Sequence, residues 1–290
     1  MSKPKVLLLA GFPNSGTTVA SYMIGQHGSV FVAGELADFP AKQLKAGKLC
    51  ACGSPAAACD FWRAVMQRLE AVASRPSPPR LGQVYRAIAA ESGAELIVDV
   101  AHDLHAVADV CGAEGIDLRL VHLRRQGLAV LNSRMRRVRG ARAALSPALQ
   151  LVRAWRHVIR WRTYNRAVGR LSRRLGEHRA IAVDYETLCA RPASALAAIG
   201  RLTDLDFTDV GVRLTAGEAL NVMPHMIRGN PRLKAKEVVR LSRDDGFTRE
   251  LALSERLAYV AASGLAPVLR RRKCRETSPQ PIRAPRKESA

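Results

Sequence analysis

A segment of eight residues near the N-terminus restricts the fold of this chain more than any other feature. An apolar run at residues 6–10 leads into a turn bounded by Gly11 and Gly16, and a helical pattern follows at residues 19–27. Glycine lets the backbone adopt tight or left-handed angles, so consecutive amide groups can point at one anion while the helix dipole adds its positive end. Strand, turn and helix together predict a phosphate-binding loop.

The composition of this turn argues against a nucleoside triphosphate as the ligand. The two glycines have the spacing of a nucleotide-binding P-loop, but Thr17 stands where such a loop has a lysine. Because that lysine normally reaches the β- and γ-phosphates, its absence disfavours an ordinary nucleoside triphosphatase or kinase.

With threonine in that place, residues 11–18 resemble the 5′-phosphosulfate-binding loop of sulfotransferases. The family's 3′-phosphate site is an arginine at a strand end and a serine eight residues later, and Arg125 and Ser133 have this spacing. A guanidinium at the strand end and a hydroxyl two helical turns later lie on the same side, so both can donate hydrogen bonds to one phosphate. Two anion sites on one sheet fit 3′-phosphoadenosine 5′-phosphosulfate (PAPS) better than ATP.

Further segments extend this resemblance from Lys5 to about Leu269. Residues 34–36 follow the second apolar segment, a cysteine-bearing insert at about 47–62 looks like one in bacterial members, and residues 183–188 look like the family's Tyr-Glu-x-Leu segment. Residues 225–231 are similar to a late loop that closes over the nucleotide. The order of these segments along the chain carries more weight than any one of them.

The resemblance implies a set of nucleotide contacts. On the 5′ side they are Asn14, Ser15, Gly16, Thr17 and Thr18; at the 3′-phosphate they are Arg125 and Ser133; Tyr185 and Arg228 complete the set. Many family members have a lysine or arginine where this chain has Asn14. Charge on the departing phosphate must therefore be stabilised from elsewhere, by Arg124, Arg228, Arg232 or Lys234, or the activity is weak.

Two residues compete for the role of catalytic base. His102 follows the third predicted strand, where cytosolic family members carry a catalytic histidine, and an imidazole accepts a proton near neutrality. Glu35 follows the second strand, at the position of the catalytic glutamate of protein-tyrosine and some carbohydrate sulfotransferases, and partial burial would raise its pKa. The structural alternatives are a hydrogen-bonded cap for His102, a helix cap for Glu35 and an ion pair between Asp99 and an arginine.

The order of elements predicts an α/β fold, a three-layer sandwich with a central parallel sheet like that of P-loop nucleotide triphosphatases. Strands are expected at residues 5–9, 30–33, 96–100, 118–122 and 180–183, with helices at about 61–73 and 147–175 among those between and after them. We expect one sulfotransferase domain over residues 1–269. Residues 270–290 mix charges with prolines and have no apolar period, so we expect a disordered basic tail.

Charge and composition limit the location and partners of the chain. Its 46 Lys and Arg against 25 Asp and Glu give a net charge of +21, which attracts phosphates, sulfated sugars, nucleic acid or an anionic membrane surface. No secretory signal or membrane span is visible, so the expected location is cytoplasmic, with peripheral attachment to an anionic membrane left open. The sequence indicates no oligomeric state.

The six cysteines are too few for a small disulfide scaffold. Cys50, Cys52 and Cys59 offer three thiolates for zinc, but a fourth ligand is not evident nearby and Cys-x-Cys is not the usual zinc knuckle. We therefore expect reduced thiols rather than a disulfide or a metal site, and the catalysis implied by the resemblance needs no metal.

Taken together, the sequence predicts a PAPS-dependent sulfotransferase that moves a sulfuryl group to a hydroxyl or amine of a small-molecule, carbohydrate or lipid acceptor, without specific nucleic-acid binding. The alternatives are a P-loop nucleotide-dependent phosphotransferase and a catalytically inactive protein of the same fold. The latter would bind nucleic acid or another anion through its basic surface, with the salt sensitivity of phosphate contacts.

Overall fold

The computed structural model describes residues 3–37, 39–40, 44, 49–72, 79–139, 146–230, 233, 238–242 and 245–263. The predicted tail at residues 270–290, the domain boundary at residue 269, Pro231 of the late loop, and two candidate cations, Arg232 and Lys234, lie outside the described residues.

A sheet of five parallel strands forms the centre of the molecule. In sheet order the strands are β2 (Val30–Gly34), β3 (Leu96–Ala101), β1 (Lys5–Ala10), β4 (Asp117–Arg124) and β5 (Ala180–Asp184). The five predicted strands are confirmed, each with its end moved by one or two residues. Both faces of β1 are buried, which is why its sequence is a continuous apolar run rather than an alternating one.

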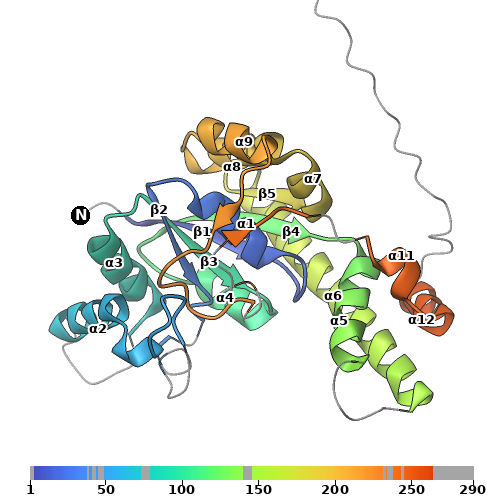
Figure 1. Ribbon diagram of the computed structural model, residues 1–290. Coiled ribbons are helices and arrows are strands. Elements are labelled where there is room, and N and C mark those ends of the chain that lie inside the picture. The colour runs from blue at the N-terminus through green and yellow to red at the C-terminus, as the bar shows by residue number, and fades with distance from the viewer. Residues whose placement is uncertain are drawn as a thin grey trace, which may run out of the picture.

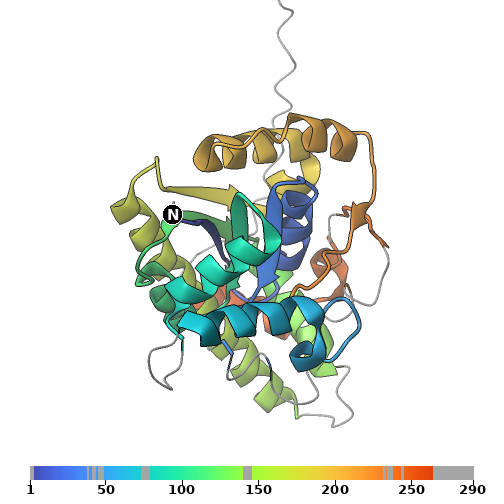
Figure 2. The same ribbon diagram turned by 90° about the vertical axis from the view of Figure 1, so that its left-hand side faces the viewer.

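Helices cover both faces of this sheet, as the two views in Figures 1 and 2 show. On one face, Leu7 and Leu9 of β1 pack in a core with α1 (Thr17–Gly25), α8 (Pro192–Thr203) and α9 (Thr208–Thr215). On the other face, Val6 and Leu8 pack with side chains of the remaining covering helices. These are α2 (Asp60–Val72), α3 (Leu81–Ser92), α4 (Leu104–Cys111) and α6 (Pro147–Leu175). The predicted three-layer α/β sandwich is confirmed.

A third, smaller core lies to one side of the sandwich (Figure 1). The first half of α6 packs there with α5 (Gly127–Arg139) and α12 (Leu253–Ser263), while α11 (Phe247–Glu250) lies against α5. Ion pairs between Arg136 and Glu250 and between Arg139 and Glu255 join α5 to this C-terminal part. Within the described residues, no helix is both long enough and apolar enough to cross a membrane.

The strand order places the ends of five strands along one edge. Because β1 pairs with β3 on one side and β4 on the other, Ala10 aligns with Ala101 and with His122. The chain thus leaves β1 at the point where the connections turn to opposite sides of the sheet, which is where open parallel sheets bind ligands. Each strand is followed, at this edge, by one segment that the sequence predicts to belong to the site.

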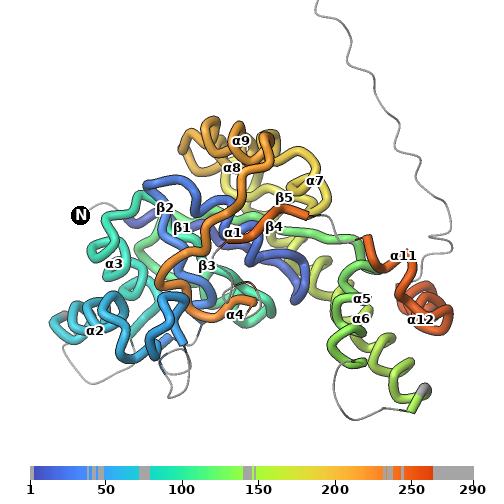
Figure 3. Tube along the Cα trace, in the orientation of Figure 1, coloured from blue at the N-terminus to red at the C-terminus, as the bar shows by residue number. Residues whose placement is uncertain are grey.

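The segment after α9 returns to the same edge. It follows β6 (Leu220–Asn221), which pairs with the later strand β7 (Val238–Val239) in antiparallel orientation. Within this segment, Ile227 forms bridges to Gly34 and to Cys50. Figure 3 shows this orange segment beside the end of β2. Gly34 has a φ of +97°, and a Cβ atom there would lie 2.0 Å from the carbonyl oxygen of Ile227. Glycine is therefore required for the late loop to reach the sheet.

Candidate functional site

The predicted phosphate loop has the geometry of an anion cradle. Asn14 and Gly16 both adopt left-handed backbone angles, with φ of 71° and 90°, and α1 starts directly after them. No side chain of the described residues caps this helix, so its first amide groups point into the loop without an intrahelical acceptor. The uncapped amides and the helix dipole favour a negative group at this place.

A buried hydroxyl in the loop also lacks a partner. Ser15 is 1% exposed, and its Oγ atom has no hydrogen-bond partner among the residues that the structure describes. A buried polar atom without a partner costs free energy, so such atoms in native structures normally mark a bound group or water. Together with the open amides, this hydroxyl fits the phosphate side of a nucleotide.

Arg125 brings a positive charge to the same loop. It follows the last residue of β4, and its Nη1 donates to the carbonyl oxygen of Asn14 at 2.9 Å. The guanidinium carbon lies 4.8 Å from the centre of the Tyr185 ring. The two predicted anion-binding groups, the loop and Arg125, are thus in direct contact, within the span of one nucleotide.

Tyr185 forms a wall of the loop. It is the buried first residue of α7 (Tyr185–Ala190), and a Cβ atom at Gly16 would lie 2.2 Å from its ring. Close approach of this ring is a second reason for glycine at position 16. Ser133 lies half-buried in α5, two turns after Arg125. The nucleotide roles of Tyr185 and Ser133 stay predictions.

The two competing candidates for the base are in contact with each other. The Nε2 atom of His102 lies 3.5 Å from Oε1 of Glu35, and the Nδ1–H of His102 donates to the carbonyl oxygen of Gly11 at 2.7 Å. Both side chains are about one-fifth exposed. His102 thereby joins the start of the phosphate loop to the carboxylate after β2.

Arg228 lies on the other side of Glu35. Its Nε atom is 3.3 Å from Oε2 of Glu35, so the carboxylate stands between a guanidinium and an imidazole. Residue 228 adopts a left-handed φ of 62° within the late loop, and the backbone N–H of Asn230 donates to Oγ1 of Thr18 at 3.2 Å. The late loop is therefore attached both to the base candidates and to the phosphate loop. Its predicted contact with the nucleotide through Arg228 stays a prediction.

The charges of Glu35 and His102 are mutually stabilised. Burial alone would raise the pKa of Glu35, but His102 and Arg228 outweigh it and hold this pKa below its ordinary value. The expected rise in the pKa of Glu35 is therefore wrong. Burial alone would lower the pKa of His102, but the Glu35 carboxylate outweighs it and raises this pKa. Each charge therefore favours the other, and both groups are ionised at pH values between their two folded pKa values.

Asp99, which was not predicted as a site residue, holds the backbone next to Glu35. It is fully buried in β3, and its carboxylate accepts hydrogen bonds from the backbone N–H of Leu36 at 3.0 Å and from the hydroxyl of Tyr85 at 2.5 Å. Burial raises the pKa of Asp99 to about 6. Among the described residues no arginine pairs with Asp99, so the alternative of an Asp99–arginine ion pair is wrong. An acidic residue in the otherwise apolar strand 96–100 was the signal that marked it.

Arg124 is already paired on the adjacent strand. Its Nε and Nη2 atoms donate to the two carboxylate oxygens of Asp184 at 2.9 and 3.1 Å. This bidentate pair neutralises Arg124. Two of the cations proposed to replace the missing charge at position 14 lie within the described residues, and each is paired with a carboxylate: Arg124 with Asp184, and Arg228 with Glu35. Arg125, in contrast, contacts the phosphate loop directly.

Two solved structures share the fold over almost their full length. The sulfotransferase domain from the curacin biosynthetic pathway matches 92% of this chain and 100% of its own length, with a TM-score of 0.58 and 16% identity. The sulfotransferase domain from the Synechococcus PCC 7002 olefin synthase matches 92% and 98%, with a TM-score of 0.51 and 19% identity. Neither a family model nor a curated protein matches the sequence. The chain thus has the α/β fold of these sulfotransferase domains.

The Glu35–His102 pair predicts a specific dependence of stability on pH. The lowered pKa of Glu35 contributes stability above its ordinary value of 4.5, which is lost as the pH falls through the folded value. The raised pKa of His102 contributes fully below 6.5 and is lost as the pH rises through the folded value. The loss of unfolding free energy in Glu35→Gln, measured by urea denaturation, should therefore be largest between pH 4.5 and 6.5 and should become smaller as the pH rises through the folded pKa of His102.

The matched control is Glu218→Gln, a half-exposed carboxylate on the loop after α9 that pairs with Arg213. It should cost little at any pH. Asp99 and Arg228 are present in both the parent and the Glu35→Gln protein. Most of the contribution of Asp99 to the pH dependence therefore cancels in the difference between their unfolding free energies. A loss in Glu35→Gln that is independent of pH would contradict the ion pair.

Proposed function

We propose that the protein is a PAPS-dependent sulfotransferase. The observation that carries this proposal is the contact between Arg125 and the carbonyl oxygen of Asn14, which brings a guanidinium to an uncapped phosphate loop without a lysine. A ligand with two anionic ends and no need for a P-loop lysine would satisfy both groups. PAPS has this form, and the fold of the chain supports the same reading.

On the donor side, different groups of the chain would hold the two phosphates. The amides of residues 16–18, the hydroxyls of the loop and the dipole of α1 would hold the 5′-phosphate, since the amide of Ser15 already donates to the carbonyl oxygen of Phe12. The guanidinium of Arg125, with the hydroxyl of Ser133 on α5, would hold the 3′-phosphate, since a guanidinium binds phosphate in a bidentate fork. PAPS itself supplies the sulfuryl group.

On the acceptor side, the Glu35–His102 pair would remove the proton. The acceptor oxygen or nitrogen forms a bond to sulfur, the bond between sulfur and the phosphate oxygen breaks with its electrons on the phosphate, and the acceptor proton goes to the pair. In its ionised form the pair offers the Glu35 carboxylate as the proton acceptor, while His102 holds it next to the loop through Gly11. The base is then the pair rather than one of two rival residues.

Stabilisation of the departing phosphate would come from fixed groups around the loop. Asn14 contributes no charge, but its carbonyl oxygen holds Arg125 at the loop, and the dipole of α1 acts at the same place. Position and electrostatics rather than covalent catalysis would thus carry the rate enhancement.

A metal-dependent phosphotransferase is supported less well. It would need a lysine where Thr17 stands and a carboxylate open to magnesium, whereas Asp99 accepts hydrogen bonds from Leu36 and Tyr85, and Glu35 faces His102 and Arg228. We propose a small-molecule, carbohydrate or lipid hydroxyl or amine as the acceptor. An inactive anion-binding protein would lack sulfuryl transfer and would bind polyanions with a steep dependence on salt.

Loss of Arg125 should weaken donor binding. Arg125→Ala removes a charged hydrogen-bond donor worth about 1.5–3 kcal/mol, so the Kd for adenosine 3′,5′-bisphosphate, measured by titration calorimetry, should rise about 10- to 100-fold. The control Arg213→Ala removes a guanidinium paired with Asp209 and Glu218 on and after α9, and its Kd should match that of the parent. Equal affinity in Arg125→Ala and the parent would refute the assignment of the 3′-phosphate site.

Loss of the base should lower turnover while donor binding is kept. Release of adenosine 3′,5′-bisphosphate from PAPS, with the best acceptor from a panel of phenols, sugars and amines, should fall about 10²- to 10⁴-fold in Glu35→Gln and in His102→Asn. Because the two residues act as a unit, the double variant should be no slower than the slower single variant. Losses that multiply in the double variant would show that the residues act independently.

A further inference from the structure

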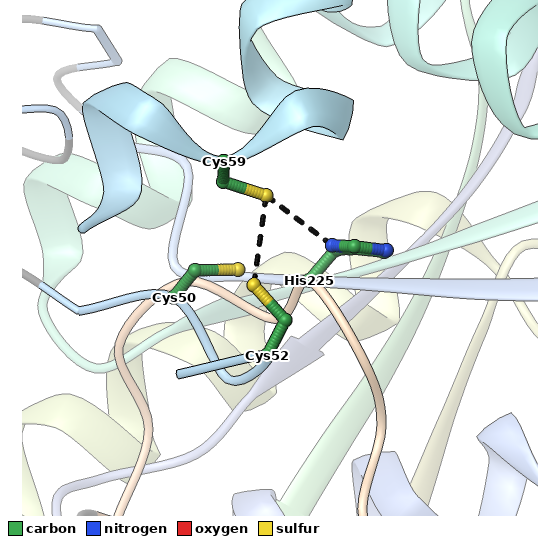
Figure 4. A group of neighbouring side chains, drawn as sticks. All are labelled: Cys50, Cys52, Cys59 and His225. Carbon is green, nitrogen blue, oxygen red and sulfur yellow. Dashed lines mark hydrogen bonds between the residues drawn. The ribbon is translucent and has the colours of Figure 1, made fainter. Parts of the chain in front are cut away.

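Four potential metal ligands from distant parts of the sequence meet beside the candidate site. Cys50 and Cys52 precede the short 3₁₀ turn η1 (Ala56–Ala58), Cys59 follows it, and His225 belongs to the late loop. Figure 4 shows the four side chains directed toward one another, and their ligand atoms all lie within 4.8 Å of one another. The sequence revealed the three thiols but not the fourth ligand, because His225 is 166 residues away from Cys59 along the chain.

The distances within this Cys₃His cluster suit one tetrahedral ion. The sulfur atoms of Cys52 and Cys59 are 3.7 Å apart, and Sγ of Cys59 is 3.3 Å from Nδ1 of His225. With zinc–sulfur bonds of about 2.3 Å and zinc–nitrogen bonds of about 2.0–2.1 Å, tetrahedral geometry gives about 3.8 Å between sulfurs and about 3.5 Å between sulfur and nitrogen. These two distances match the tetrahedral spacings, and the other distances between ligand atoms are at most 4.8 Å.

The surroundings hold three of the four ligands, His225, Cys50 and Cys52, in place. The indole Nε1–H of Trp62 donates to the carbonyl oxygen of His225 at 2.8 Å, and the ring of Phe61 stacks on the imidazole with centroids 5.2 Å apart. The backbone N–H groups of Cys52 and Ser54 donate to the sulfurs of Cys50 and Cys52. Outer contacts of this kind orient the ligands of metal sites and stabilise thiolate sulfur.

From these contacts we propose that Cys50, Cys52, Cys59 and His225 bind a structural zinc ion. Three thiolates and one imidazole make a soft donor set that selects zinc among the common divalent ions. Four protein ligands close the coordination shell, so the ion has no open position for a substrate. This proposal replaces our expectation that the cysteine insert holds no metal.

The zinc ion would fasten the late loop to the cysteine insert. The backbone already joins the two at the bridge between Cys50 and Ile227 and at the hydrogen bond from the N–H of Ala51 to the carbonyl oxygen of Met226, 3.2 Å long. His225 stands three residues before Arg228, whose guanidinium faces Glu35. The ion would thus fix the position of a loop that reaches both the Glu35–His102 pair and the phosphate loop. Its presence does not depend on the reaction that the protein catalyses.

Metal content of the full-length protein tests the proposal. Protein purified without chelator should contain about one zinc ion per chain by mass spectrometry of the metal, and Cys59→Ser and His225→Ala should lose most of it. Cys111→Ser and Cys189→Ser, which remove thiols outside the cluster, should keep it. Zinc at the parental level in both Cys59→Ser and His225→Ala would overturn the proposal, as would a metal-free parent that takes up no added zinc.

Cobalt in place of zinc gives a second readout that requires no variant. The parent chain loaded with Co²⁺ should show the intense thiolate-to-cobalt absorption and the visible bands of tetrahedral coordination. Six-coordinate cobalt spectra, or a disulfide between Cys52 and Cys59 by peptide mass mapping of freshly purified protein, would overturn it. Removal of zinc should also speed hydrogen exchange at residues 223–230, and unchanged exchange there would refute the fastening role.

Discussion

Parallel pairing of β1 with β3 on one side and β4 on the other is the interaction on which the rest of the structure depends. The register of these two ladders aligns Ala10 with Ala101 and His122, so the chain segments after three central strands begin at the same edge. The phosphate loop, His102 and Arg125 come from those segments. The outer strands add Glu35 and Tyr185 at the same edge, and the site follows from sheet topology rather than from closeness in sequence.

Two groups of charged side chains then divide this edge. On one side Arg125 contacts the phosphate loop, and on the other Glu35 lies between His102 and Arg228. His102 links them, because its Nδ1–H binds Gly11 at the start of the loop and its Nε2 faces Glu35. A donor bound at the loop would therefore lie next to a group able to take a proton, which is the arrangement that group transfer requires.

The sequence predicted the parts whose signal is local. Apolar runs indicated the five strands, and the glycines around residues 11–16 indicated the loop. The sequence did not show that Glu35 and His102 touch, because that contact depends on the pairing of β2 with β3, nor that His225 reaches the cysteines across most of the chain. Asp99 was missed because its partners, Leu36 and Tyr85, lie on other elements. Tertiary contacts of this kind leave no pattern in one short segment.

The central claim is that this edge of the sheet binds one adenosine ligand by two anionic ends, and thermal unfolding tests it most directly. Adenosine 3′,5′-bisphosphate at about 100 times its Kd should stabilise the protein by about 2.7 kcal/mol and raise the unfolding midpoint, because it binds the native state alone. Adenosine 5′-monophosphate, which lacks the 3′-phosphate, and ATP with magnesium should raise it far less at the same concentration. A larger rise with ATP and magnesium than with the bisphosphate would contradict the account.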